Sequence, residues 1–197
     1  MASDMLDTAN LTPSQQERRQ RMLAAAQELA IEGGWDAVQM RDVSERADVA
    51  LGTLYRYFPS KVHLLVGVMR SATETLGRSL ERRPAEGTTA AERVFEVLDR
   101  GTRALQREPK LTEAMVRALM FADATAADDV NEVTSQTTTT IIAAMNANGR
   151  TPSDDDTSVA RVLEMVWLTS ILSWLSGRCT TDEMTEDLTV ATRLLVR

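Results

Sequence analysis

Apolar residues recur along this chain with the period of an α-helix from residue 12 to the C-terminus. The first stripe comprises Met22, Leu23, Ala26, Leu29 and Ala30. Residues three or four apart lie on one face of a helix, so this stripe predicts an amphipathic helix with a buried side. No alternating strand pattern extends beyond four residues. The pattern therefore predicts an all-α protein.

Cap and breaker residues divide this pattern into nine helices. Capping boxes are predicted at Thr12, Thr89 and Thr180, and Gly33–Gly34 is predicted to stop the first helix as a left-handed cap. Most other starts have a Ser N-cap or an opening proline, and Gly or Pro follows most other ends. Residues 1–11 carry no such pattern, and we expect them to be disordered. The predicted helices span residues 13–32, 40–47, 51–57, 61–83, 89–107, 109–121, 128–148, 157–176 and 180–197.

The two short helices at residues 40–47 and 51–57 are joined by a tight connection, which is the pattern of a helix-turn-helix. In such a unit the second helix enters the major groove of DNA. Arg41 opens the first of the two helices, and we expect it to reach a guanine or a phosphate. Leu54 and Phe58 lie four residues apart, so we expect them to pack inward and hold the second helix in place.

The second short helix carries side chains suited to contacts with DNA. Gly52 lets the backbone approach a phosphate or a base closely, and Thr53 offers a hydroxyl and a methyl group. Tyr55 and Tyr57 are rigid and end in a hydroxyl. Lys61 follows at the start of the next helix, where free N–H groups and the helix dipole favour a phosphate. The alternative is that both tyrosines are half-buried aromatics of a small helical core.

Residues 52–61, GTLYRYFPSK, resemble the DNA-binding segment of the TetR family of bacterial transcriptional repressors, whose typical pattern is G-T-L-Y-x-[HY]-F-x-[SN]-K. The resemblance covers residues 14–65 and implies about nine helices, a homodimer, and an N-terminal reader of operator DNA coupled to a C-terminal ligand pocket. Leu51 stands where many members have a polar residue, so whether this position contacts a base is left open. An apolar contact with a thymine methyl group is one option. The positions that match DNA-contacting residues of the family are Arg41, Thr53, Tyr55 and Tyr57, with Lys61 as a phosphate clamp.

On this basis we predict a DNA-binding domain at residues 12–60 and a ligand-binding and dimerisation domain at residues 61–197. The longer segment from residue 38 to residue 65 also resembles the sterol-catabolism repressors of actinobacteria, a subgroup of the family. That resemblance implies control of lipid or sterol catabolism and a hydrophobic effector such as a steroid acid or its coenzyme A thioester. A regulator of drug efflux that responds to a hydrophobic compound is the alternative.

Apolar side chains of the predicted helices at 109–121 and 128–148 are candidates for lining a ligand pocket. Methionines adapt to irregular apolar shapes, although such a stripe also suits a simple core. The hydroxyls of Thr137 and Thr140 meet either a ligand carbonyl or the preceding turn of their own helix. The predicted pocket residues are Met115, Leu119, Met120, Phe121, Thr137, Ile141 and Met145.

The predicted helix at 157–176 is apolar almost all round, which is unusual for a surface helix of a monomer. We expect this helix and the last one to pair with their copies in a two-fold, four-helix interface. The alternative is a central helix buried within a monomer. The predicted interface residues are Trp167, Ile171, Trp174, Leu188 and Leu195.

Composition bears on the remaining function classes. The net charge of −7 opposes DNA binding, but residues 14–61 hold equal numbers of basic and acidic residues, so a local site can still be positive. His63 and Cys179 are single and far apart in sequence, and we find no metal motif, cofactor loop or nucleophile motif. We expect a cytoplasmic protein without a membrane span that is not an enzyme. Two rival classes of function remain, a helical enzyme and a helical interaction module that does not bind DNA.

Overall fold

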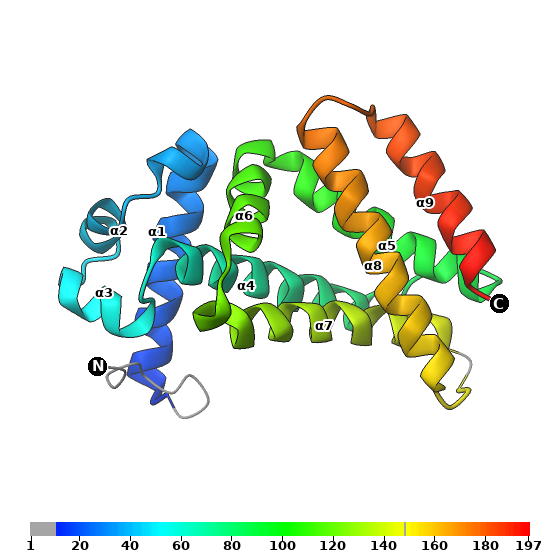
Figure 1. Cartoon of the computed structure of the whole chain (residues 1–197). Helices are drawn as coiled ribbons and strands as arrows, with labels where there is room; N and C mark the ends of the chain where they lie inside the picture. Colours follow the sequence, from blue (N-terminus) through cyan, green and yellow to red (C-terminus); the bar gives the residue numbers. More distant parts are fainter. Residues whose placement is uncertain (1–10, 148) are drawn as a thin grey trace. The chain divides into compact units, whose positions relative to one another are not determined.

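The computed structural model of the chain describes residues 11–147 and 149–197, and within them it contains nine α-helices, one 3-10 turn and no strand (Figure 1). The all-α prediction is confirmed. The predictions of disorder before residue 11 and of a helix end at Asn148 lie outside the described residues. The elements are α1 (Pro13–Ala37), α2 (Met40–Arg46), α3 (Leu51–Tyr57), α4 (Lys61–Arg82), α5 (Ala90–Arg107), α6 (Pro109–Phe121), η2 (Ala124–Ala126), α7 (Ala127–Met145), α8 (Asp154–Leu175) and α9 (Thr181–Leu195).

The chain forms two compact units that do not follow a single cut in the sequence. The first unit contains residues 11–71 and 108–131, and the second contains residues 72–107 and 132–197. Helix α6 therefore belongs with the N-terminal helices, whereas the predicted division at residue 60 placed it in the C-terminal domain. Helices α4 and α7 contribute residues to both units.

The first unit is built on α1, which packs along α6 and against α2. A capping box between Thr12 and Gln15 starts α1, as predicted. The predicted break at Gly33–Gly34 is present, because Gly34 has a non-helical backbone with a φ of 69°, and a short second helical segment follows to Ala37. The core beneath the helix-turn-helix includes Leu54 and Phe58, which are both buried as predicted.

The turn between α2 and α3 fixes the angle of the helix-turn-helix. Asp48 has a φ of 52°, in the left-handed region that Asp tolerates better than most residues. The N–H of Val49 donates to the carbonyl of Ser44 at 3.0 Å, and that of Asp48 donates to Glu45 at 3.2 Å. This pair of hydrogen bonds is the Schellman arrangement that ends a helix and turns the chain sharply.

The second unit contains α5, α8 and α9, with α9 packed on both of the others. Helix α8 begins at Asp154, three residues before the predicted start at Thr157, because Ser153 and Asp156 form a capping box. The Asp156 carboxylate accepts hydrogen bonds from the Ser153 N–H and from Arg150. These bonds, the first of them foremost, lower the pKa of Asp156 below its ordinary value of 3.8.

Helix α8 is long and apolar enough to cross a membrane by length and composition, with a mean hydropathy of 1.3 over 18 residues. The sequence analysis expected no membrane span, and a single helix that meets this criterion is weak evidence for one. A helix that packs inside a helical protein passes the same test. Within this stretch 22% of the residues are buried, and its exposed large apolar side chains are Val162 and Met165.

Candidate functional site

Helix α3 presents one face to solvent and one to the core of the first unit. Leu51, Gly52 and Tyr55 are exposed and Thr53 is partly exposed, the side chain of Tyr55 at 46%. A Cβ built on Gly52 would meet no atom within 4 Å, so nothing inside the chain demands glycine at this position. Four of the predicted DNA-contacting residues of α3 are thus accessible to solvent at least in part. Arg56, which the sequence prediction left out, is exposed beside Tyr55.

Tyr57 does not belong to that surface. Its side chain is 6% exposed, and its hydroxyl is buried without a hydrogen-bond partner among the described residues. The residue lies three positions after Leu54 and therefore on the buried face of the seven-residue helix. The prediction that Tyr57 reaches a phosphate is corrected, and the alternative of a core aromatic describes this residue better.

Lys61 lies at the start of α4 and contacts the end of α1. Its Nζ donates to the carbonyl of Trp35 at 3.0 Å and sits 4.3 Å from the centre of the indole ring. Burial lowers the pKa of Lys61, Asp36 acts in the opposite sense, and the nearby Arg117 lowers it further. An ammonium group has three donors, so the bond to Trp35 positions the side chain and leaves N–H groups for a phosphate.

Arg41 is exposed at the first turn of α2 and pairs with Glu45, Nε to Oε1, at 3.1 Å. Both side chains are open to solvent, and exposed pairs of this kind contribute about 0–1 kcal/mol. The arginine can therefore exchange Glu45 for a phosphate or a guanine at small cost. Arg46 is engaged differently, since it donates two hydrogen bonds to Glu32 on α1 and ties α2 to that helix.

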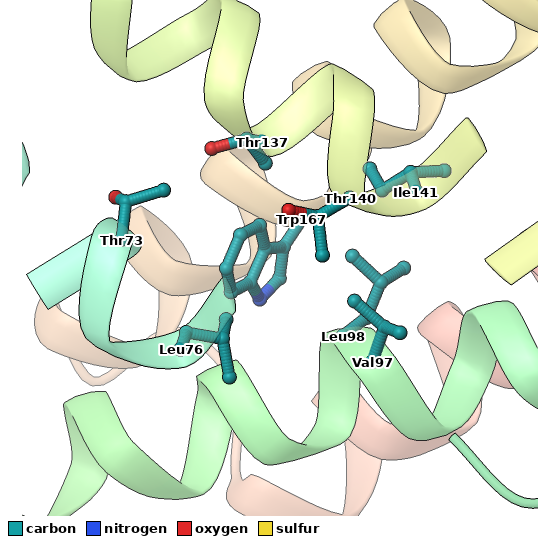
Figure 2. Close-up of a pocket in the computed structure, with 8 residues that line it drawn as sticks. All are labelled: Thr73, Leu76, Val97, Leu98, Thr137, Thr140, Ile141 and Trp167. Carbon is teal, nitrogen blue, oxygen red and sulfur yellow. The ribbon is translucent and has the colours of Figure 1, made fainter. Parts of the chain in front are cut away.

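The second unit encloses a small cavity of about 30 Å³ among side chains of α4, α5, α7 and α8. Figure 2 shows its centre taken by the indole of Trp167, with the threonines of α7 on one side and leucines of α4 and α5 on the other. Ligand pockets of known proteins measure about 300–1,000 Å³. The lining residues are Thr73, Leu76, Val97, Leu98, Thr137, Thr140, Ile141 and Trp167.

Trp167 was predicted at the dimer interface but points into this cavity. Its Nε1 donates to Thr102 Oγ1 on α5 at 2.9 Å. Gly101 makes room for the ring, because a Cβ there would lie 2.7 Å from the Cζ2 atom of the indole. The sequence signal that was overlooked is this glycine in the middle of a predicted helix, which indicates close approach by another group.

Two of the seven predicted pocket residues, Thr137 and Ile141, line the cavity. Met120 and Phe121 do not, since each is 62% exposed at the end of α6. Thr137 and Thr140 donate to the carbonyls of the preceding turn, at 3.0 and 2.8 Å, as the simpler alternative expected. Met115 and Leu119 belong to the first unit, and Met145 is buried at the end of α7 without lining the cavity. The predicted set for α6 and α7 included core residues, because side chains that pack in a core and side chains that line a pocket recur with the same helical period in the sequence.

Glu164 on α8 adds a polar group beside the cavity that the sequence prediction did not consider. Its Oε2 accepts a hydrogen bond from Thr138 Oγ1 at 2.9 Å. Burial raises the pKa of Glu164 to about 7, although the hydroxyls of Thr138 and Thr137 lower it in part. The carboxyl group is therefore divided between its neutral and ionised forms near neutral pH.

The predicted interface helices α8 and α9 lie side by side (Figure 1). Both helices expose apolar side chains. Ile171 and Leu188 are buried within the chain, so they support the unit rather than face a partner, whereas Trp174 and Leu195 are half-buried. The large apolar residues exposed on these two helices are Val162, Met165, Val190 and Leu194, with Leu194 at 70%. We call these four residues the apolar face.

Comparison with known proteins agrees with the helix-turn-helix geometry and the all-α architecture. Residues 22–68 match the family described as bacterial regulatory proteins, tetR family, and residues 87–195 match the tetracyclin repressor-like C-terminal domain. The chain is 45% identical to the HTH-type transcriptional repressor KstR of Mycobacterium tuberculosis, over 93% of this chain and 82% of that protein. It is equally identical to KstR of Rhodococcus jostii, over 93% and 84%.

Solved structures show the same fold. A TetR transcriptional regulator from Rhodococcus sp. RHA1 superposes with a TM-score of 0.86 at 37% identity, covering 93% of this chain and 97% of that one. FadR of Thermus thermophilus, solved in complex with lauroyl-CoA, has a TM-score of 0.72 at 23% identity, covering 90% and 92%. Both family matches and the long, closely similar relatives lead to one conclusion: the chain belongs to the TetR family of bacterial transcriptional regulators, which are not enzymes.

Proposed function

We propose that this protein is a cytoplasmic, homodimeric repressor that a hydrophobic effector releases from its operator DNA, and that it controls lipid or sterol catabolism. The observation that carries the proposal is the 45% identity with KstR repressors over nearly the whole chain, including the residues of both units. The resemblance of residues 38–65 to sterol-catabolism repressors supports a steroid acid or its coenzyme A thioester as effector. No observation favours the alternative of an efflux regulator.

The proposed contact with DNA is the exposed face of α3 with its neighbours. Thr53 and Tyr55 offer hydroxyls, Gly52 admits the DNA backbone, and Arg41 and Lys61 supply positive charge at the two sides. In a dimer, two such helices read half-sites about 34–36 Å apart, one turn of the double helix. The acidic groups that make the whole chain negative do not prevent this, since salt screens charges beyond about 10 Å at 0.1 M.

The proposed switch is a population shift between an operator-binding and an effector-binding form. The cavity of about 30 Å³ is far too small for a steroid, so effector binding requires Trp167 and its neighbours to move. Helix α4 carries Lys61 at its first residue and the cavity residues Thr73 and Leu76 further along. A displacement of that continuous helix alters the setting of the DNA-binding residues, provided that the effector binds the non-operator form more tightly.

The DNA-binding part of the proposal is tested by selecting operator fragments from genomic DNA and measuring their affinity at several salt concentrations. We expect affinity to fall steeply with salt because Arg41 and Lys61 displace counterions from phosphates. The double variant Arg41→Ala/Lys61→Ala should bind at least tenfold more weakly. The control is Arg178→Ala, an exposed arginine after α8. Equal losses from both variants would contradict the proposed surface.

The effector part is tested by titrating the protein–operator complex with three compounds: a steroid acid, its coenzyme A thioester, and lauroyl-coenzyme A. Release by the steroid compounds at lower concentration than by lauroyl-coenzyme A supports the sterol assignment. Release by lauroyl-coenzyme A alone would move the effector to straight-chain fatty acids. If none of the three releases the operator, the effector class proposed here is wrong.

The dimer is proposed to form through the apolar face. Single exposed apolar residues are ordinary, but four large ones on two helices that pack side by side indicate a partner. We expect the double variant Met165→Arg/Leu194→Arg to sediment as a monomer at micromolar concentration, while the wild type sediments as a dimer. A wild-type protein that is monomeric under these conditions would contradict the proposal.

A further inference from the structure

We propose that Glu164, beside the lining residue Thr137, recognises an uncharged ring oxygen, a ketone or a hydroxyl, on an otherwise apolar effector. This inference rests on the proposed function, because it names the part of the effector that lies against Glu164. It also gives the effector a direction. A carboxyl group beside a carboxylate or a phosphate is unfavourable, so the acid or coenzyme A end must lie away from Glu164.

The position of Glu164 follows from its contacts on two helices. On α7, Thr138 donates to Glu164, and the adjacent Thr137 both lines the cavity and lies close enough to affect the carboxyl. On α8, Trp167 follows one turn later and occupies the centre of the cavity, as Figure 2 shows. Residues three apart share a helix face, so Glu164 stands at the α7–α8 edge of the space that Trp167 fills. Movement of the indole would bring this edge into contact with a ligand.

The lack of a cation at Glu164 distinguishes it from the other shielded carboxyl groups of the second unit. Glu96 pairs with Arg100 at 2.7 Å, Asp156 pairs with Arg150 at 2.7 Å, and Asp99 pairs with Arg103. Glu164 has only hydroxyl partners in the part of the chain that the structure describes.

A partly buried carboxyl without a cation is unfavourable for folding, and a leucine at the same place would be more stable. The groups that face Glu164 from α7 are the neutral Thr137 and Thr138. On its own helix, the nearest charged residue along the chain, Arg161, is exposed and forms no ion pair with it among the described residues. A carboxyl group at this place is explained if it binds something outside the chain.

The chemistry of the group sets the class of ligand oxygen. In its neutral form a carboxyl donates its O–H to a ketone or a hydroxyl, and in its ionised form it accepts only from a hydroxyl. Because the pKa of Glu164 is about 7, both forms are present near neutral pH. A ketone ligand should therefore bind less tightly as pH rises above 7, whereas a variant with an amide in place of the carboxyl should show no such change.

The experiment measures binding to the full-length protein by calorimetry with two matched probes. One is the coenzyme A thioester of 3-oxochol-4-en-24-oic acid, and the other is the same thioester without the 3-oxo group. We expect the wild type to prefer the oxo probe by about tenfold, the amount that one hydrogen bond to a buried partner provides. Glu164→Leu should abolish the preference, while Glu164→Gln, whose amide still donates, should keep it and lose its dependence on pH.

Glu186→Gln is the matched control, because it removes a carboxylate from an exposed position on α9. It should leave the preference and its pH dependence unchanged. Equal binding of the two probes by the wild type, or a preference that survives in Glu164→Leu, would overturn the inference. Operator release by both probes in either of those cases would leave the proposed function standing, and absence of binding by both probes would overturn the inference and the steroid effector together.

Discussion

The burial of Tyr57 gives the sharpest test of how α3 is built. Removing its hydroxyl with Tyr57→Phe should stabilise the protein, because that oxygen is buried without a partner among the described residues. An unsatisfied buried polar group costs about 1–3 kcal/mol, and we expect a gain near the lower end, about 1 kcal/mol, since the ring keeps its packing. In a chain of this length, that gain corresponds to a rise of about 2–4 °C in Tm.

The assay is thermal and urea unfolding at one fixed protein concentration, because dimerisation makes apparent stability depend on concentration. Operator affinity, measured in parallel, should stay within about twofold of the wild type. The matched variant is Tyr55→Phe, which removes the same hydroxyl from a side chain that is 46% exposed. It should leave stability within about 0.5 kcal/mol and weaken operator binding by about two- to tenfold.

The opposite pattern would refute this reasoning. If Tyr57→Phe lowered stability and weakened operator binding, while Tyr55→Phe did neither, the hydroxyl of Tyr57 would have a partner on the DNA and the assignment of the two faces of α3 would be wrong. A loss of stability in Tyr57→Phe with unchanged DNA affinity would instead show that the hydroxyl has a partner within the protein.

Three further predictions concern single positions. Gly52→Ala should raise stability by about 0.5–1 kcal/mol, since no atom of the chain lies near the new Cβ, yet weaken operator binding; unchanged affinity would place Gly52 outside the interface. Gly101→Ala should lower the free energy of unfolding by about 1–3 kcal/mol through its clash with Trp167, and a Trp167→Phe background should reduce that loss. The lowered pKa of Asp156 means that its ionised form stabilises the fold, a contribution present above pH 4 and lost as pH falls through the folded pKa; Asp156→Asn should therefore flatten the acid limb of the unfolding profile, and an unaltered limb would argue against this cause.

Local signals in the sequence predicted the helices well, because caps and breakers act over a few residues. The boxes at Thr12 and Thr180 start α1 and α9 as expected. The box at Ser153 was missed because an aspartate takes the place of the usual Glu or Gln. Gly34 interrupts α1 with a left-handed backbone as predicted, and the short helical segment that follows it to Ala37 has no signal in the sequence pattern.

The candidate sites were harder to predict because they depend on which side of a helix faces the core. The pattern around α3 identified the helix-turn-helix but placed both tyrosines on one surface, although a helix turns about 200° over two residues. Trp167 looked like an interface residue because an apolar helix gives no sign of which neighbour each side chain meets. Its direction is determined by contacts with Gly101 and Thr102, which lie more than 60 positions earlier in the chain.

The first unit is formed by two separate stretches of the chain, and this limits how its helix-turn-helix can be transferred to another regulator. Helix α6 covers α1, and His63 at the start of α4 lies 3.1 Å from the carbonyl of Thr125 through its Nε2. A chimeric regulator that contains only residues 12–60 of this chain would lack α6. The apolar side of α1 that α6 covers would then be exposed to solvent, and the chimera would aggregate or unfold. To exchange operator specificity between relatives, the exposed residues of α3 should therefore be substituted within a full-length protein. Fusion of an isolated helix-turn-helix segment to another regulator should fail.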